Sequence, residues 1–294
     1  MPPIWISIKA IAQLVWQQVL RLKALIPLSE AQWYKLDLLK DLVQRDLAAR
    51  YKGSVLGSGW ALIKQLAQLL IYTYLFSVVL KVDPSDRGVP TGNANVTYSL
   101  WLFAGLLPWL TFSSSLSSAA RVVLQQRNLV TKVIFPLELL PLIPVLSAFL
   151  ESTFGLVVLI LFTTTLSQTL HITLLLLPLA WLPQLLLTVG LAYLTAALTV
   201  FLRDIPEMVD IFLRVWFYAT PILYPLDLVP DPIRTLITWL NPLTAVVATY
   251  REVILLGEIS SWQMWSVAVG LSAIVCGLGY WVYQHLRSTF ADIL

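Results

Sequence analysis

Long apolar runs separated by short polar stretches dominate the chain. About 20 consecutive apolar residues cross the hydrocarbon core of a bilayer as a helix. The runs that reach this length are 60–80, about 97–119, about 137–163, about 174–201, 205–224 and about 263–286. The pattern therefore predicts an all-α, polytopic membrane protein with six transmembrane helices. Pro136, Pro141 and Pro144 predict an irregular start to the third helix.

Two polar stretches outside these runs have helical periodicity. Residues 30–54 predict an amphipathic helix that is too polar to span and suits the inner leaflet, either as a passive anchor or as a docking element for a partner. Its apolar positions are Trp33, Leu36, Leu39, Val43 and Leu47. Residues 120–136 predict a short helix, and they are longer than the two to eight residues usual between antiparallel helices. This stretch is either an ordinary loop or a partner surface.

The stretch 228–261, between the fifth and sixth runs, reads as two short helices. Asn241-Pro242 breaks it in the middle, and Pro242 suits the first position of a helix because its missing N–H costs nothing there. We expect helices at about 231–240 and 243–256. The alternative, a seventh span, would place charges in lipid at a considerable cost. The charged residues concerned are Arg234, Arg251 and Glu252.

Composition and charge set the class and the orientation. The chain is 58% hydrophobic and 12% charged, with mean hydropathy +0.80, whereas soluble domains have about 25% charged residues. Lys and Arg collect on cytoplasmic loops, and here they gather before the first run and between the second and third runs. The other side holds only Lys81, Arg87, Arg234 and Arg251. Both termini are therefore expected in the cytoplasm.

The sequence holds no recognisable motif for covalent or nucleotide chemistry. The glycine-rich stretch 53–60 lacks the Lys-Ser/Thr of a phosphate loop. His171 and His285 fall near opposite membrane faces, and Cys276 is the only cysteine, so no metal site or disulfide is expected. A membrane protein without its own energy-coupling site is a channel, an ion-driven carrier or the permease half of a motor.

Four segments, in order, resemble one family. They are "LVQRDLAARYKGSVLGSGWALIKQLAQLLIYTYLFSVVLK" (42–81), "NLVTKVIFPLELLP" (128–141), "FLRDIPEMVDIFLRVWFYATPILYP" (201–225) and "LNPLTAVVATYREVILLG" (240–257). Together they resemble the ABC-2 type permeases, the membrane subunits of ABC transporters that export O-antigen, capsule and teichoic acid polysaccharides. The resemblance covers about residues 30–290. It leaves residues 1–29 as an N-terminal extension.

This resemblance implies a homodimer in the plasma membrane, which is the inner membrane of a bacterium. The dimer would pair with two copies of a cytoplasmic ABC ATPase and move a lipid-linked glycan between the protomers. This chain would bind no cofactor or nucleic acid, and ATP and Mg would sit on the ATPase. The alternatives are export of a drug or small lipid on the same fold, and an ion-coupled carrier or membrane transferase acting alone.

Within the family pattern, residues 30–55 form the interface helix and 56–290 the transmembrane domain. The domain would include a coupling helix at about 121–132 and outer gate helices at about 229–257. The expected substrate path is lined by Tyr72, Phe76, Asp210, Arg214, Phe217, Tyr218 and Tyr224. The residues expected to couple to the ATPase are Arg45, Arg50, Gln125, Gln126, Arg127, Asn128 and Leu129. The expected outer gate residues are Trp239, Asn241, Pro242, Tyr250 and Arg251.

The charges inside the spans need a partner. Asp210 and Arg214 lie four residues apart on one helix face, so the spacing predicts that they pair, with Phe217, Tyr218 and Pro221 continuing the face. The pair either lines the path, where aromatic rings stack on sugars, or is only structural. Glu151 near mid-span costs about 2.5–3.5 kcal/mol unless it faces protein or water. It is expected to line the path, stay protonated or hold two helices together.

Overall fold

The computed structural model describes residues 29–57, 59–80, 98–132, 135–167 and 171–294. Every regular element in these residues is helical, which confirms the all-α prediction. The helices are α2 (Glu30–Arg50), α3 (Gly59–Tyr72), α4 (Tyr98–Gln125), α5 (Arg127–Lys132), α6 (Leu142–Ser167), α7 (Leu177–Phe201), α8 (Ile205–Ala219), α9 (Asp231–Leu240), α10 (Pro242–Arg251), α11 (Trp262–Leu286) and α12 (Phe290–Ile293). The predicted extension 1–29 lies outside the described residues apart from Ser29.

Four segments are long and apolar enough to cross a membrane. They are Tyr98–Gln125, Leu137–Thr165, Ile172–Phe201 and Trp262–Thr289. The first predicted span is α3 continued by a π-helical segment, Thr73–Val79. The fifth is α8, which at 15 residues is only about 22 Å long, against a hydrocarbon core of about 30 Å.

The fifth helix ends earlier than the predicted 224 because the backbone turns extended at Thr220, with ψ 135°, directly before Pro221. Proline disfavours a helical conformation in the residue that precedes it.

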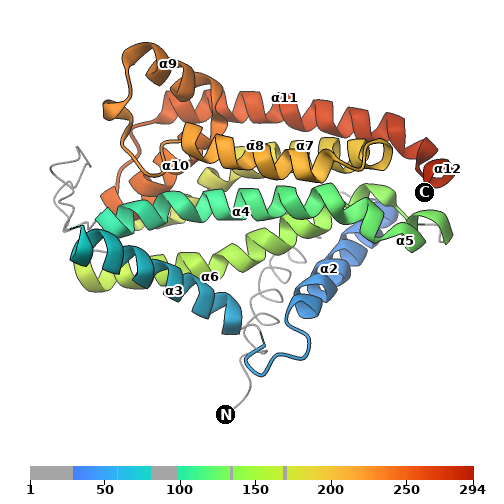
Figure 1. Cartoon of the computed structure of the whole chain (residues 1–294), viewed down its shortest axis with the longest axis horizontal. Helices are drawn as coiled ribbons and strands as arrows, with labels where there is room; N and C mark the ends of the chain where they lie inside the picture. Colours follow the sequence, from blue (N-terminus) through green and yellow to red (C-terminus); the bar gives the residue numbers. More distant parts are fainter. Residues whose placement is uncertain (1–28, 58, 81–97, 133–134, 168–170) are drawn as a thin grey trace.

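The helices divide by end of the molecule. In Figure 1, α2, α5 and α12 lie at one end of the long helices, and α9 and α10 lie at the other. This separation matches the sequence expectation that residues 30–54 and 120–136 share one side and 228–261 takes the other.

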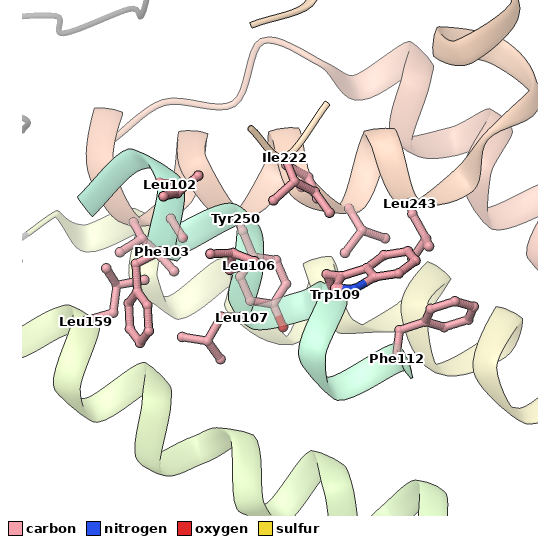
Figure 2. Packing of buried hydrophobic residues seen from close by; sticks show 14 of the residues in the cluster. Leu102, Phe103, Leu106, Leu107, Trp109, Phe112, Leu159, Ile222, Leu243 and Tyr250 are labelled. Atoms are coloured by element: carbon pink, nitrogen blue, oxygen red, sulfur yellow. The ribbon is translucent and has the colours of Figure 1, made fainter. Parts of the chain in front are cut away.

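Helix α4 forms the centre of the bundle. It packs against α6, α7, α8 and α10, and its side chains Phe103, Leu107 and Phe112 are fully or almost fully buried. Figure 2 shows α4 between Leu159 of α6 and Tyr250 of α10. Helix α4 therefore contacts helices at both ends of the bundle, α5 at one end and α10 at the other.

Helices α7 and α11 meet backbone to backbone. A Cβ added to Gly279 would lie 2.0 Å from the carbonyl oxygen of Gly190, and one added to Gly190 would lie 2.6 Å from the backbone of Cys276. Small residues at such positions let two membrane helices approach closely. Glycine is therefore required at both positions of this seam.

Two short outer helices were predicted, and both are present. Helix α9 has the predicted bounds, and α10 begins at Pro242, whose neighbour Asn241 caps the helix by accepting a 3.2 Å hydrogen bond from the Leu243 N–H. The chain continues as a π turn, Glu252–Leu256, and ends at Gly257, whose φ of +76° favours glycine. The seventh-span alternative needs one continuous helix here, whereas the structure breaks the stretch at Asn241 into α9 and α10, of 10 residues each.

The predicted coupling helix needs a correction. Residues 122–125 belong to α4, which runs unbroken to Gln125, and only Arg127–Lys132 form a separate helix, α5. The sequence here contains no proline or glycine before Pro136, so nothing stops α4 at the end of its apolar run.

Helix α2 has the predicted amphipathic character. It begins with a capping box in which Ser29 and Gln32 satisfy each other's backbone N–H groups. Its buried residues Trp33, Leu39, Val43 and Leu47 come from the predicted apolar face, and the helix ends at Arg50 rather than continuing to 55. Glu138 fastens its start, because its carboxylate accepts from Lys35 at 2.7 Å and from Arg287 at 3.1 Å.

Candidate functional site

A groove of about 470 Å³ runs between α3, α4 and α8. It gathers predicted path residues that are far apart in sequence: Tyr72, Asp210, Arg214, Phe217 and Tyr218. The other lining residues are Gln68, Leu106, Trp109, Leu110, Ser113, Ser117 and Leu213. The groove combines aromatic rings with hydroxyl, amide and charged groups, which is unlike a surface that only faces lipid.

The aromatic rings form one wall of this groove. The Trp109 ring lies 5.4 Å from the Phe217 ring, and Phe217 lies 5.2 Å from Tyr218, measured between centroids. Sequence analysis missed Trp109, Ser113 and Ser117. Their spacing of four residues places them on one face of α4, and a polar stripe inside an apolar run was the signal that could have found them.

Two predicted path residues lie elsewhere. The Phe76 ring packs 5.0 Å from Tyr98 and 6.5 Å from Tyr72, above the groove lining rather than in it. The Tyr224 hydroxyl donates a 2.8 Å hydrogen bond to the Tyr218 carbonyl oxygen. Pro221, expected to continue the charged face, is buried.

The predicted Asp210–Arg214 pair is wrong. Arg121 of α4 reaches across to α8 and donates to Asp210 at 2.7 Å and to Glu207 at 3.2 Å. The Ser117 hydroxyl donates to the second Asp210 oxygen at 2.7 Å. Arg214 acts on Asp210 only through charge attraction at longer range. The i,i+4 spacing permitted the intrahelical pair, but α4 and α8 lie side by side and offer Asp210 closer donors.

A cleft of about 570 Å³ opens at the end of the bundle that the sequence predicts to be cytoplasmic, between α2, α4, α5 and α6. Most of the predicted coupling residues line it: Arg45, Arg50, Gln125, Gln126, Asn128 and Leu129. Arg127 is not part of its lining. The cleft wall also contains Asp46, whose carboxylate lies 3.0 Å from Arg50, so a partner would meet paired charges beside free amide groups.

Glu151 connects α6 to the end of α2. Its carboxylate accepts from the Tyr51 hydroxyl at 2.5 Å and from Arg50 at 3.2 Å. Burial, and then the bond to Glu151, raise the pKa of Tyr51 above its ordinary value, so the phenol keeps its proton and donates. Of the three expected roles of Glu151, the geometry corresponds to holding two helices together.

Two of the predicted outer gate residues, Asn241 and Arg251, form hydrogen bonds at the point where α8 ends. Asn241 accepts from the Trp216 indole N–H at 3.0 Å and donates to the Thr220 hydroxyl oxygen at 3.0 Å. Arg251 donates to the carbonyl oxygens of Pro221 at 2.9 Å and Ile222 at 2.8 Å.

Arg251 also connects to α4. It donates to the Trp101 carbonyl oxygen at 3.2 Å, and its guanidinium lies 3.3 Å from the centre of the Trp101 ring. Tyr250 donates to the Gln184 side chain at 3.2 Å, while Trp239 is 41% exposed on α9.

A helical bundle with four segments able to cross a membrane, a groove along it and a cleft at one end is the architecture of a multi-pass membrane protein. Residues 37–255 match the family model for the ABC-2 type transporter, and the chain belongs to that family.

Relatives of known name extend the comparison. The O-antigen export system permease protein RfbA of Myxococcus xanthus is 31% identical over 258 residues, which cover 87% of this chain and 94% of that protein. A protein of the same name from Klebsiella pneumoniae is 29% identical over 267 residues, covering 89% of this chain and 96% of that protein.

Proposed function

We propose that the chain is the membrane permease of an ABC transporter that exports a lipid-linked polysaccharide of the O-antigen, capsule or teichoic acid type. The observation that carries the proposal is 31% identity, across 87% of the chain, to an O-antigen export permease. The aromatic wall of the groove supports a glycan cargo, because rings can lie against sugar faces while hydroxyl groups bond the sugar edges.

The proposed assembly is a homodimer in the plasma membrane with two copies of a separate cytoplasmic ABC ATPase. ATP and Mg bind to that ATPase, and the purified permease alone does not hydrolyse ATP. Each protomer has six spans, counting α3 with its π segment and α8. The position of α2, α5 and α12 at one end supports an even number of spans (Figure 1).

In the proposed mechanism the grooves of two protomers face each other and form the path. Sugar rings stack on Tyr72, Trp109, Phe217 and Tyr218 as the glycan passes. The ATPase docks at the cytoplasmic cleft, and its movement reaches the groove through α4, which lines both. The outer helices α9 and α10 move away from the end of α8, and this opening releases the lipid-linked product.

Complementation tests the proposal. In a bacterium that makes the glycan and its ATPase but lacks the permease, this chain is expected to restore surface glycan, while cells without it accumulate lipid-linked precursor inside. An assembled complex that leaves the precursor inside would contradict glycan export. ATPase activity stimulated by a drug or a small lipid, and not by the precursor, would favour the alternative cargo.

One pair of tyrosines makes this test specific to the groove. Tyr72 lines the groove, whereas Tyr74, two residues later, is 63% exposed on another face of the same segment. Tyr72→Ala removes a stacking surface worth about 1 kcal/mol, so surface glycan is expected to fall several-fold. Tyr74→Ala serves as the control and is expected to export normally. Equal export by both variants would place the path elsewhere.

A further inference from the structure

A second, more polar cavity lies beside the groove. It measures about 360 Å³, is open on one side, and is bordered by α3, α4 and α6. The two hollows share Gln68, Leu110, Ser113 and Ser117, so they adjoin along one face of α4 and one residue of α3. The further polar residues around the second cavity are Lys64, Gln65, Thr111, Ser114, Glu151 and Ser152. Of these, only Glu151 was considered for the path from the sequence, as one of three roles.

The polar groups around this cavity do not satisfy one another. The hydroxyls of Ser113 and Ser114 donate back to carbonyl oxygens of their own helix, at 3.3 Å each, which leaves their lone pairs without a donor. The Gln65 side-chain oxygen is buried and has no hydrogen-bond partner among the described residues. Such groups are costly in a membrane interior unless water or a ligand bonds them.

The size of the cavity argues for a ligand larger than one ordered water. At about 30 Å³ per water molecule, 360 Å³ corresponds to roughly twelve waters. A hollow of this size inside the span region, open to a proposed transport path, holds mobile water until a larger polar molecule replaces it.

The chemistry of the lining selects the ligand. The hydroxyl oxygens of Ser113 and Ser114 can still accept from a ligand, and Lys64 can donate to one. A sugar hydroxyl both donates and accepts. A phosphate only accepts, and it would face the Glu151 carboxylate, which also lies in the wall.

We propose that this polar cavity is a second sugar subsite, which bonds the hydroxyl groups of one glycan residue while the neighbouring residue stacks in the aromatic groove. This inference rests on the proposed function. The aromatic groove would bind the faces of sugar rings, and the polar cavity would bind the hydroxyl groups at their edges. Successive sugars of one glycan chain would therefore contact walls of different chemistry.

Substitution of the residues that belong only to this cavity tests the proposal. In the complete complex with its ATPase, Ser114→Leu and Gln65→Leu are each expected to lower surface glycan per assembled permease about fivefold, the value of one hydrogen bond of about 1 kcal/mol. Ser266→Leu is the matched control. Ser266 is also exposed on a long apolar helix and also donates to the carbonyl three residues earlier, but it lines neither hollow.

Labelling gives a second readout that a folding defect does not imitate. In a Cys276→Ala background, Ser114→Cys is expected to react with a water-soluble maleimide several-fold more slowly in cells that make the glycan than in cells blocked in its synthesis. Gln263→Cys, at the exposed start of α11, is expected to react equally in both.

The outcomes separate this inference from the proposed function. If the wild-type complex moves no glycan, the proposed function fails. If the wild type exports and Ser114→Leu and Gln65→Leu match the Ser266→Leu control, the cavity holds only water and the subsite is overturned. If Lys64→Met alone blocks export while the other two variants remain active, the cavity binds an anionic headgroup, which also overturns the sugar subsite.

Discussion

Arg251 is a buried charge that joins α10 to α4 and to the segment after α8. Arg251 is 8% exposed, and its guanidinium donates to carbonyl oxygens of α4 and of the segment after α8. Gly105 makes this possible, because a Cβ there would lie 2.5 Å from the guanidinium. The sequence suggested that the Arg251 charge would be costly to place in a membrane, but in the structure its guanidinium is hydrogen-bonded on several sides.

Replacement of Arg251 is expected to destabilise the fold. Arg251→Met leaves the buried carbonyl oxygens of Pro221 and Ile222 without their donor, at about 1–3 kcal/mol each, so the thermal midpoint of the purified protein should fall strongly. Arg234→Met is the control, because Arg234 is 40% exposed and pairs only with the exposed Asp227 and Asp231, and surface pairs contribute about 0–1 kcal/mol. Equal losses in the two variants would show that the carbonyl bonds contribute little.

A double-mutant cycle tests which cation pairs with Asp210. Arg121→Gln and Asp210→Asn remove the two ends of the observed contact, so their effects on the thermal midpoint are expected to be non-additive, with a coupling free energy of about 1 kcal/mol. The same cycle with Arg214→Gln in place of Arg121→Gln is expected to be additive. Coupling to Arg214 and not to Arg121 would restore the pair that the i,i+4 spacing suggested.

At the scale of helices, the sequence predicted best where a local signal marks a boundary. Asn241-Pro242 gave the junction of α9 and α10, and the apolar periodicity gave the buried face of α2. Periodicity describes the faces of one helix but not which helix lies opposite. The partner of Asp210 was missed for this reason, since Arg121 is 89 positions away.

The same reason explains which site residues were found. Charged and aromatic residues in unusual places, such as Asp210 and Tyr72, attract attention as a sequence is read. The serines of α4 and Gln65 are common in membrane helices, and only the structure shows that they face one hollow. The α7–α11 seam was likewise missed, because Gly190 and Gly279 have no special local signature.

Two glycines of α11 give a matched test of the seam. Gly279→Ala places a methyl group 2.0 Å from the Gly190 carbonyl oxygen and must separate the helices, whereas a Cβ at Gly277 has nothing within 4 Å. Gly279→Ala is expected to lower the thermal midpoint, and Gly277→Ala to leave it unchanged or raise it slightly, because alanine favours helix by about 1 kcal/mol. A tolerated Gly279→Ala would mean that α7 and α11 lie further apart.

For the whole molecule, the cytoplasmic cleft provides the docking prediction. Cysteines at Gln125 and Asn128, which line the cleft, are expected to cross-link to cysteines on the ATPase when the complex is assembled in membranes. Arg203→Cys, in the turn between α7 and α8, is the comparison position. Cross-links from Arg203 and none from the cleft would show that the ATPase engages the other cytoplasmic turn.

The seam of α7 and α11 also limits how the molecule can change shape. Two helices in backbone contact cannot slide or rotate against each other without collision, because Gly190 leaves no space at Gly279 or Cys276. We therefore expect α7 and α11 to move as one rigid unit during transport, without changing their relative position. The movement that drives transport would then fall to the other side of the bundle, where Arg121 and Ser117 of α4 bond Asp210 of α8 through contacts that can break and form again.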